Sequence, residues 1–445
     1  MGSLVGLMLH PNFPHSFTMW WTQNIRVLTL KWAGQVNLFF GGELYPPEFK
    51  TMLFSTTALS LTFFLCSLAT LLVLRPRSTG TVYLFLAMLA FGVLTMLSKR
   101  FIEYAAPLVV AYAAFLTRDL LSDEDLGRWF RTRPLACQLV AWVVVGVQTG
   151  LLVHSYLDIR RDLVAEAPPN MKEAALWLKQ HSKPGQIVFT ADWDDFPELF
   201  YYNDQNRYLI CLDPAFFYEY DPVQWKLWYN VANVYCQDIF NPIKLQFKAH
   251  WLLCTNDFSR LVKKASADPR FAKVFDRNGV SIYQLEDDLD FLTDWSVTGP
   301  YTGSLNWDSK VLAAVEARSA ATGGVRSFVR WPREALGSFV DLERLMVGAE
   351  DASAYAACLL DSPVDQDGEL LMGYDDAMVV WLNGRSMYYD PGPTEVVVDA
   401  RHVPLRLKAG TNSLVLRCSN IKQNWGFCAR LSGFKQRVTG RRLIQ

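Results

Sequence analysis

Residues 52–74, MLFSTTALSLTFFLCSLATLLVL, form an uncharged apolar run that decides the architecture of this chain. A helix of this length can cross the hydrocarbon layer of a bilayer, which is about 30 Å thick. The run ends at Arg75-Pro76-Arg77, where two cations flank a helix-breaking proline. Three more apolar stretches follow, over residues 81–97, 101–116 and 135–153. The sequence therefore predicts an α-helical membrane bundle of about four spans within residues 51–156.

The placement of Lys and Arg predicts the orientation of these spans. Two arginines follow the first span and four follow the third, whereas the turn between the second and third spans carries only Lys99 and Arg100. Cytoplasmic loops are enriched in Lys and Arg. We therefore expect residues 1–50 and everything after His154 to lie on the outer side of the membrane.

Residues 1–50 predict an external loop that contains an amphipathic helix. Polar side chains occupy the opposite face to one apolar stripe, which suits a helix lying in the membrane interface. A helix packed against the bundle is the alternative. The residues of the apolar stripe are Phe17, Trp21, Ile25, Leu28, Trp32, Val36 and Phe39.

The composition of the whole chain excludes several classes of protein. Of its 445 residues, 51% are hydrophobic and 20% are charged, which is too apolar for a disordered chain. The net charge of −1 provides no basic field for nucleic acid. The eight cysteines show no Cys-x-x-Cys or Cys/His zinc spacing, so we predict no metal site; free thiols are favoured over one or two disulfides.

Residues 157–286 predict a small external α/β domain. Asn170 and Glu173 form a capping-box pattern before a helix that ends near His181. Strands are expected over residues 186–190, 250–254, 271–275 and 280–285. The last two flank Asn278-Gly279, which is typical of a tight hairpin turn.

Residues 287–445 predict an all-β sandwich. Short alternating segments are separated by turns such as Asn383-Gly384 and Ala409-Gly410. The chain is thus expected to be multidomain, with a membrane bundle, an α/β domain and a β-sandwich. The seven predicted strands of the sandwich cover residues 354–360, 369–373, 378–382, 395–399, 403–407, 413–418 and 425–431.

The first 285 residues resemble the C-terminal half of bacterial GT-C glycosyltransferases. The resemblance rests on HPNFPHSF at 10–17, SKRFIEYAAPLVVAYAAF at 98–115, AALWLKQHSKPGQIVFTADWDDFPELFYYN at 174–203 and RYLICLDPAFFYEYDP at 207–222. It implies a multi-pass protein of the bacterial inner membrane with periplasmic domains. It also implies transfer of a sugar from a polyprenyl-phosphate-linked donor to an acceptor.

One departure from that family matters. Its members usually carry a catalytic acid in the first external loop, within a bundle of roughly eight or more spans, and this chain has about four. The chain is therefore expected to be a fragment, to work with a separate catalytic membrane subunit, or to transfer no sugar.

The last 150 residues look like a galactose-binding-like jelly roll. The segments that carry this resemblance are DWSVTGPY at 294–301, LLMGYDDAMVVWLNGR at 370–385 and LKAGTNSLVLRCSNIKQNWGFCARL at 407–431. Domains of this kind are appended to glycan-active proteins, and many serve only as spacers.

Three groups in the first 200 residues are candidates for chemistry. Lys99 and Arg100 would bind the donor phosphate beside Glu103, because a phosphate leaving group needs its charge neutralised. Alternatively, the two cations extend their side chains to the membrane surface, and Glu103 is their internal partner. Asp192, Asp194 and Asp195, with Glu198, would seat an acceptor hydroxyl, hold a divalent cation or supply a general base. One of them could instead simply cap a helix. His10, Asn12 and His15 would form a site in a proline-bounded loop, and a plain loop is the alternative.

The jelly roll contains four candidates for glycan binding. Asp375 and Asp376 would bind sugar hydroxyls or Ca²⁺, or satisfy turn amides instead. Trp381 and Trp425 would stack on a sugar ring, or belong to the core. Two functions follow: sugar transfer at the outer membrane face, or a non-catalytic membrane-anchored subunit that binds glycan or protein.

Overall fold

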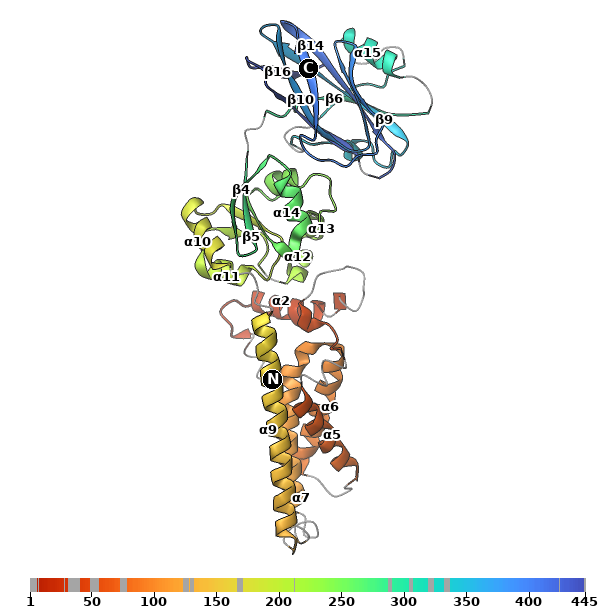
Figure 1. Cartoon of the computed structure of the whole chain (residues 1–445). Coiled ribbons are helices and arrows are strands. Elements are labelled where there is room, and N and C mark those ends of the chain that lie inside the picture. The colour runs from red at the N-terminus through yellow and green to blue at the C-terminus, as the bar shows by residue number, and fades with distance from the viewer. Residues whose placement is uncertain are drawn as a thin grey trace. The chain divides into compact units, whose positions relative to one another are not determined.

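The computed structural model describes residues 6, 8–27, 29–30, 41–48, 56–72, 78–122, 128, 132–165, 171–211, 213–286, 290–303, 307–318, 324–331, 337–423 and 425–443. The chain divides into two compact units, Met1–Pro168 and Pro169–Gln445. Figure 1 shows helices in the first unit and three sheets with further helices in the second. The multidomain architecture predicted from the sequence is therefore present.

The first unit contains four apolar helices, α5 (Thr57–Leu72), α6 (Thr79–Leu97), α7 (Ile102–Ser122) and α9 (Pro134–Ala165). Among the residues that the structure describes, three stretches are long and apolar enough to cross a membrane: Thr79–Leu97, Lys99–Ser122 and Trp142–Arg161. The apolar part of α5, Thr57–Thr70, is shorter. The span predicted over residues 52–74 stays a prediction, because part of it lies outside the described residues. Helix α9 continues past the predicted domain boundary at residue 156.

Helices α5, α6 and α7 pack around a small apolar core. Met88 of α6 meets Val109, Tyr112 and Leu116 of α7, and α5 covers them. Polar contacts fix the ends: the Asp119 carboxylate accepts hydrogen bonds from Thr81 Oγ1 (2.7 Å) and from the backbone N–H of Ser78 (2.9 Å). Pro107 lies inside the continuous helix α7.

The N-terminal region forms helix α2 (His15–Trp21), which continues as the π-helical turn η1 (Thr22–Arg26). Figure 1 shows α2 running across the direction of α9. Phe17, Trp20 and Trp21 expose between 38% and 45% of their surface. This exposure favours the interfacial helix over one packed on the bundle. The rest of the predicted apolar stripe, apart from Ile25, lies outside the described residues.

The α/β part of the second unit contains a five-stranded sheet in the order β2-β1-β3-β5-β4. Strand β1 runs parallel to β2 and β3, and β4 and β5 form the predicted hairpin, in which Asn278 and Gly279 adopt positive φ. The four strands predicted here are confirmed. The bounds are β1 (Ile187–Thr190), β2 (Arg207–Tyr208), β3 (Ala249–Thr255), β4 (Phe271–Arg277) and β5 (Val280–Leu285).

Helices cover both faces of this sheet. Helices α10 (Lys172–His181) and α11 (Phe196–Tyr202) pack on one face through a core that includes Leu178, Leu199 and Leu253. On the other side, Trp228 Nε1 donates to the carbonyl of Thr190 (3.0 Å). The helices there are α12 (Pro214–Tyr220), α13 (Pro222–Ala232) and α14 (Ser259–Ser266).

The last part of the chain is a β-sandwich, as predicted. One sheet has the order β13-β10-β15-β8 and the other the order β12-β11-β14-β9-β6-β7. The long strand β9 pairs with β14 on one side, and with β6 and then β16 on the other. The bounds are β6 (Ser296–Thr302), β7 (Val329–Arg330), β8 (Val340–Asp341), β9 (Ala352–Ser362), β10 (Gln366–Tyr374), β11 (Ala377–Leu382), β12 (Arg385–Asp390), β13 (Arg401–Leu407), β14 (Gly410–Asn420), β15 (Gly426–Ser432) and β16 (Thr439–Arg442).

The strand predicted over residues 395–399 is wrong. This segment is extended but joins no sheet, and it turns at Asp399, which has positive φ. Val396 and Val398 are buried against Phe339 and Cys428, so their hydrophobic alternation reflects packing without strand pairing. Helix α15 (Asp308–Glu316), which the sequence reading did not anticipate, packs on the outer face of the larger sheet through Val311 and Val315.

A buried ionic cluster joins the α/β part to the sandwich. Arg270, only 2% exposed, donates to Asp238 and Asp268 at 2.6 Å each. Its guanidinium also lies over the rings of Phe240 and Phe291 and donates to Ser338 Oγ (3.0 Å). Burial lowers the pKa of Arg270, but the two carboxylates raise it by more, so the side chain stays charged.

Candidate functional site

A pocket lies at one edge of the sandwich, where strand β15 leaves the smaller sheet and β16 joins the larger one. The segment 290–294 runs beside β15: the Leu292 N–H donates to the Ala429 carbonyl (2.8 Å), and Phe291 forms a β-bridge with Arg430. Trp295 is fully buried and donates from Nε1 to the Leu292 carbonyl (2.7 Å). These bonds fix one wall of the pocket, which we call the sandwich pocket.

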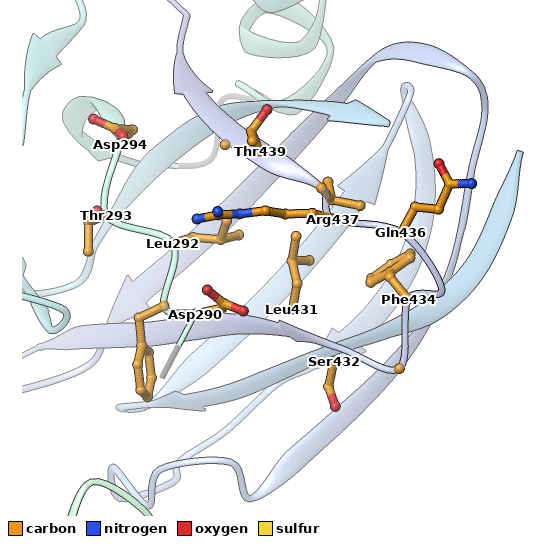
Figure 2. Close-up of a pocket in the computed structure, with 14 residues that line it drawn as sticks. Asp290, Leu292, Thr293, Asp294, Leu431, Ser432, Phe434, Gln436, Arg437 and Thr439 are labelled. Carbon is orange, nitrogen blue, oxygen red and sulfur yellow. The ribbon is translucent and has the colours of Figure 1, made fainter. Parts of the chain in front are cut away.

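The sandwich pocket has a volume of about 450 Å³, within the range of small-molecule sites. Leu292, Leu431 and Phe434 provide apolar surface, and polar side chains come from both walls. Figure 2 shows the Arg437 side chain lying across the pocket and reaching towards Leu292, with Phe434 and Gln436 at the opposite end. The remaining side chains of the lining include Asp290, Thr293, Asp294, Ser432 and Thr439.

The charged side chains of the sandwich pocket differ in whether they form ion pairs. Asp294 pairs with Arg442 at 3.0 Å. Arg437 and Asp290 are exposed, and neither side chain has a hydrogen bond or ion pair within the part of the chain that the structure describes. The pocket therefore holds one unengaged donor group and one unengaged acceptor group above an apolar floor. That combination suits a ligand that is both hydroxylated and partly apolar.

Asp375 and Asp376 lie outside this pocket, in the turn between β10 and β11. Asp376 is 9% exposed, and its Oδ2 accepts the backbone N–H of Ile421 (2.6 Å). Asp375 accepts a hydrogen bond from Gln237 Nε2 (2.5 Å); burial and the neighbouring Asp376 charge raise its pKa to about 6. Both carboxylates are thus engaged within the protein, by donors that lie outside this turn.

Trp381 and Trp425 are parts of the core. Trp425 is fully buried between the sheets, and Trp381, 6% exposed, stacks on Tyr355 beneath the helix α15 face. A ring that is this deeply buried offers no face to a sugar. The glycan-stacking alternative is therefore not carried further, and core packing accounts for both residues.

The acidic residues at 192–198 gather at the carboxyl ends of β1 and β3. Asp192 Oδ1 accepts the N–H of Asp194 (3.2 Å), and Asp195 begins α11 without a side-chain capping bond. Burial, followed by the charges of Asp192, Asp194, Asp257 and Glu198, raises the pKa of Asp195 to about 8. The charge of Asp257, which follows β3, is a contribution that the sequence reading missed. Among the described residues, no three His, Cys, Asp or Glu side chains are arranged to hold a metal ion.

Lys99 and Arg100 form a 3₁₀ turn, η3 (Lys99–Phe101), between α6 and α7. The N–H of Lys99 donates to the Tyr45 carbonyl (3.0 Å) and Ser98 Oγ donates to the Glu43 carbonyl (3.1 Å). Glu103 is exposed at the start of α7, and within the described ranges no ion pair joins it to either cation. The internal-partner role considered for Glu103 is therefore not seen.

His10 and Asn12 lie in the exposed turn before α2, and His15 is exposed at the start of that helix. The N–H of Asn12 donates to His10 Nδ1 (3.2 Å), and His15 is the first residue of α2. The six cysteines of the second unit are free thiols: Cys211, Cys236, Cys254, Cys358, Cys418 and Cys428.

The sequence reading missed the residues of the sandwich pocket. Asp290 and Arg437 are more than 140 positions apart, and neither belongs to a recognisable motif. Only the pairing of 290–294 with β15, and of β16 with β9, brings them together. No local signal in the sequence could have found this site.

No protein-family model matches the chain, and no curated protein matches it in sequence. Among solved structures, it is similar to the β-glucosidase from Kluyveromyces marxianus in complex with glucose, at 12% identity and a TM-score of 0.22, over 33% of this chain and 20% of that chain. It is also similar to the PA14 sugar-binding domain from an RTX adhesin, at 15% identity and a TM-score of 0.18, over 35% and 77% of the two chains. A family 35 carbohydrate-binding module from an environmental isolate matches at 14% identity and a TM-score of 0.18, over 35% and 95%. Each likeness covers about a third of this chain.

Proposed function

We propose that this chain is a membrane-anchored carbohydrate-binding protein whose β-sandwich holds a glycan in the sandwich pocket. The observation that carries the proposal is the presence of unengaged Arg437 and Asp290 side chains over an apolar floor. Sugar hydroxyls both donate and accept hydrogen bonds, so they can satisfy a guanidinium and a carboxylate together. The C–H face of a sugar ring would rest on Leu292, Leu431 and Phe434.

The apolar helices support a membrane setting for this function. We place the chain in the bacterial inner membrane, with residues 1–50 and both external domains on the periplasmic side. Its partners would be the lipid bilayer and a glycan or lipid-linked sugar. The mixed charges of the pocket give no reason to invoke nucleic acid.

The test is a glycan array probed with the full chain in mild detergent, followed by titration of each glycan that binds. Arg437→Ala is expected to weaken binding at least tenfold, because it removes the charged donor. Arg406→Ala is the matched control, since Arg406 is another exposed arginine of the sandwich whose pairing with Asp367 is loose, at 3.8 Å. An array without binders, or equal loss in both variants, would contradict the proposal.

A second candidate function is sugar transfer from a polyprenyl-phosphate donor, as the GT-C resemblance implies. The η3 turn favours it, because its bonds to the loop 41–48 hold Lys99 and Arg100 where a lipid phosphate could be bound. Asp195 would then serve as the base, since its pKa of about 8 lies near neutrality. A separate catalytic membrane subunit would complete such an enzyme.

This candidate is tested by native mass spectrometry of the protein drawn from its own membrane in mild detergent, with a transfer assay on the same sample. A stoichiometric second multi-pass chain, and transfer that falls on Lys99→Ala/Arg100→Ala substitution, would support it. A chain that emerges alone and transfers nothing would exclude it and leave carbohydrate binding.

A further inference from the structure

A second cavity lies at the junction of the α/β part and the sandwich, within the second unit. One wall is the face of α13 that carries Val223, Lys226, Leu227 and Asn230, together with the segment that follows it. The other wall is the stretch from Phe339 to Arg344. The volume is about 720 Å³, again within the range of small-molecule sites. We call it the junction cavity.

Both walls of the junction cavity are held in place by buried contacts. The Arg270 guanidinium pairs with Asp238, which belongs to the first wall. It also donates to Ser338, which directly precedes Phe339 of the second wall. Gln237 itself bonds to Asp375 of the sandwich (2.5 Å), and Lys264 Nζ donates to the Val396 carbonyl (2.8 Å). These contacts hold the two walls of the cavity together without a ligand.

The lining is unusually rich in carboxamide side chains. A carboxamide carries donors and an acceptor in one plane, as a pair of neighbouring sugar hydroxyls requires. Five residues of this type line the junction cavity: Gln224, Asn230, Gln237, Asn241 and Gln246.

Two of these amides have polar atoms without a partner. Gln224 Oε1 and Asn241 Nδ2 are buried and make no hydrogen bond within the described part of the chain. Asn241 is only 8% exposed. A buried polar atom without a hydrogen-bond partner lowers stability by about 1–3 kcal/mol. A ligand that formed hydrogen bonds to both atoms would recover this desolvation cost.

The charged residues of the lining are largely engaged. Asp238 pairs with Arg270, Asp341 Oδ1 accepts the Arg344 N–H (3.2 Å) and Glu343 Oε1 accepts the Gly348 N–H (2.8 Å). Lys226 lies over the ring of Tyr229, at 5.0 Å. Arg344 is an exposed cation of the lining. The groups that remain for a ligand are mainly neutral ones, which argues against an ionic ligand.

We propose that the junction cavity is a second saccharide site, which binds a short neutral sugar through Gln224 and Asn241. Tyr235, 57% exposed in the lining, stacks on a sugar ring, and Leu227 contacts its apolar face. This site is separate from the sandwich pocket and shares no lining residue with it.

The test uses the full chain in mild detergent, with the sandwich pocket silenced by Arg437→Ala/Asp290→Asn. The neutral probes are cellobiose, maltose and N,N′-diacetylchitobiose, and the anionic probe is a glucuronic-acid disaccharide; saturation-transfer NMR and calorimetry report binding. We expect at least one neutral probe to bind. Gln224→Met/Asn241→Leu should weaken that binding at least tenfold, whereas Gln180→Met, on the exposed face of α10, should not change it.

The same variants also report on folding. Gln224→Met and Asn241→Leu replace unpartnered polar atoms with apolar ones of similar size, so the thermal midpoint should not fall. The inference is overturned if no neutral probe binds the silenced protein, or if binding survives the double substitution. Tighter binding of the anionic probe, lost on Arg344→Ala, would overturn it too. The sandwich pocket is tested independently with these cavity residues intact, so either site can fail alone.

Discussion

Replacing Arg270 with methionine removes the cation that joins the α/β part to the sandwich. Asp238 and Asp268, 8% and 5% exposed, would remain buried without their partner. Breaking a buried ion pair from one side costs about 3–5 kcal/mol. The contacts with Phe240 and Phe291 add about 0.5–2 kcal/mol. We therefore expect the free energy of unfolding of the second unit to fall by about 3.5–7 kcal/mol.

The assay is hydrogen exchange on the full chain in detergent, read at β4, β5 and the segment 337–342. Arg277→Met is the control, because Arg277 contacts Glu173 only loosely, at 3.9 Å, with both side chains more than half exposed; it should cost less than about 1 kcal/mol. Arg270→Met/Asp238→Asn/Asp268→Asn should recover part of the loss, since it removes the uncompensated charges. Equal protection in Arg270→Met and the wild type would refute the reasoning.

Three further predictions concern the second unit. Because the pKa of Asp195 is raised in the folded state, the folded protein binds more protons between about pH 4 and 8, and its stability falls as pH rises through that window. Urea unfolding across this range should show the slope. Asp195→Asn should reduce it, most clearly between about pH 6 and 8, above the raised pKa of Asp375; an unchanged slope would contradict the prediction. Asp221→Ala removes a carboxylate that accepts two backbone N–H bonds at the start of α13. It should lower the free energy of unfolding by about 0.5–2 kcal/mol in the same assay. Asp221→Asn keeps a capping oxygen and should lower it far less; equal destabilisation by the two variants would contradict the capping role. Gly373→Ala would place a Cβ 2.8 Å from the Val397 carbonyl carbon and should lower the thermal midpoint, at a cost of about 1–3 kcal/mol; an unchanged midpoint would mean that the segment at Val397 moves freely.

Much of the fold could be predicted because it depends on local sequence patterns. The apolar runs, the Asn278-Gly279 hairpin and the alternation of the sandwich strands each fall within a short window of sequence. The failures have physical causes. Residues 395–399 alternate because Val396 and Val398 pack inward, not because they pair in a sheet. Helices α12 and α13 were hidden among aromatic residues, although Asp213 and Asp221, each before a proline, are capping signals.

The sites were much less predictable than the fold. Trp425 and Asp376 were predicted as glycan-binding residues because of their residue types. In the structure Trp425 is buried in the core, and Asp376 is buried and accepts a backbone hydrogen bond. The pocket residues Asp290 and Arg437 are inconspicuous, and they meet only through long-range strand pairing. The Asp192–Asp195 group was found from its position after a strand, but the contribution of Asp257 depends on β1 and β3 lying side by side.

The most direct test of the central claim is hydrogen exchange of the full chain with and without a glycan that binds on the array. Carbohydrate binding in the sandwich pocket predicts slower exchange in the segments 290–294 and 431–440, and no such effect in the Arg437→Ala variant at the same glycan concentration. Protection confined to other parts of the chain, or protection that persists unchanged in Arg437→Ala, would contradict the account.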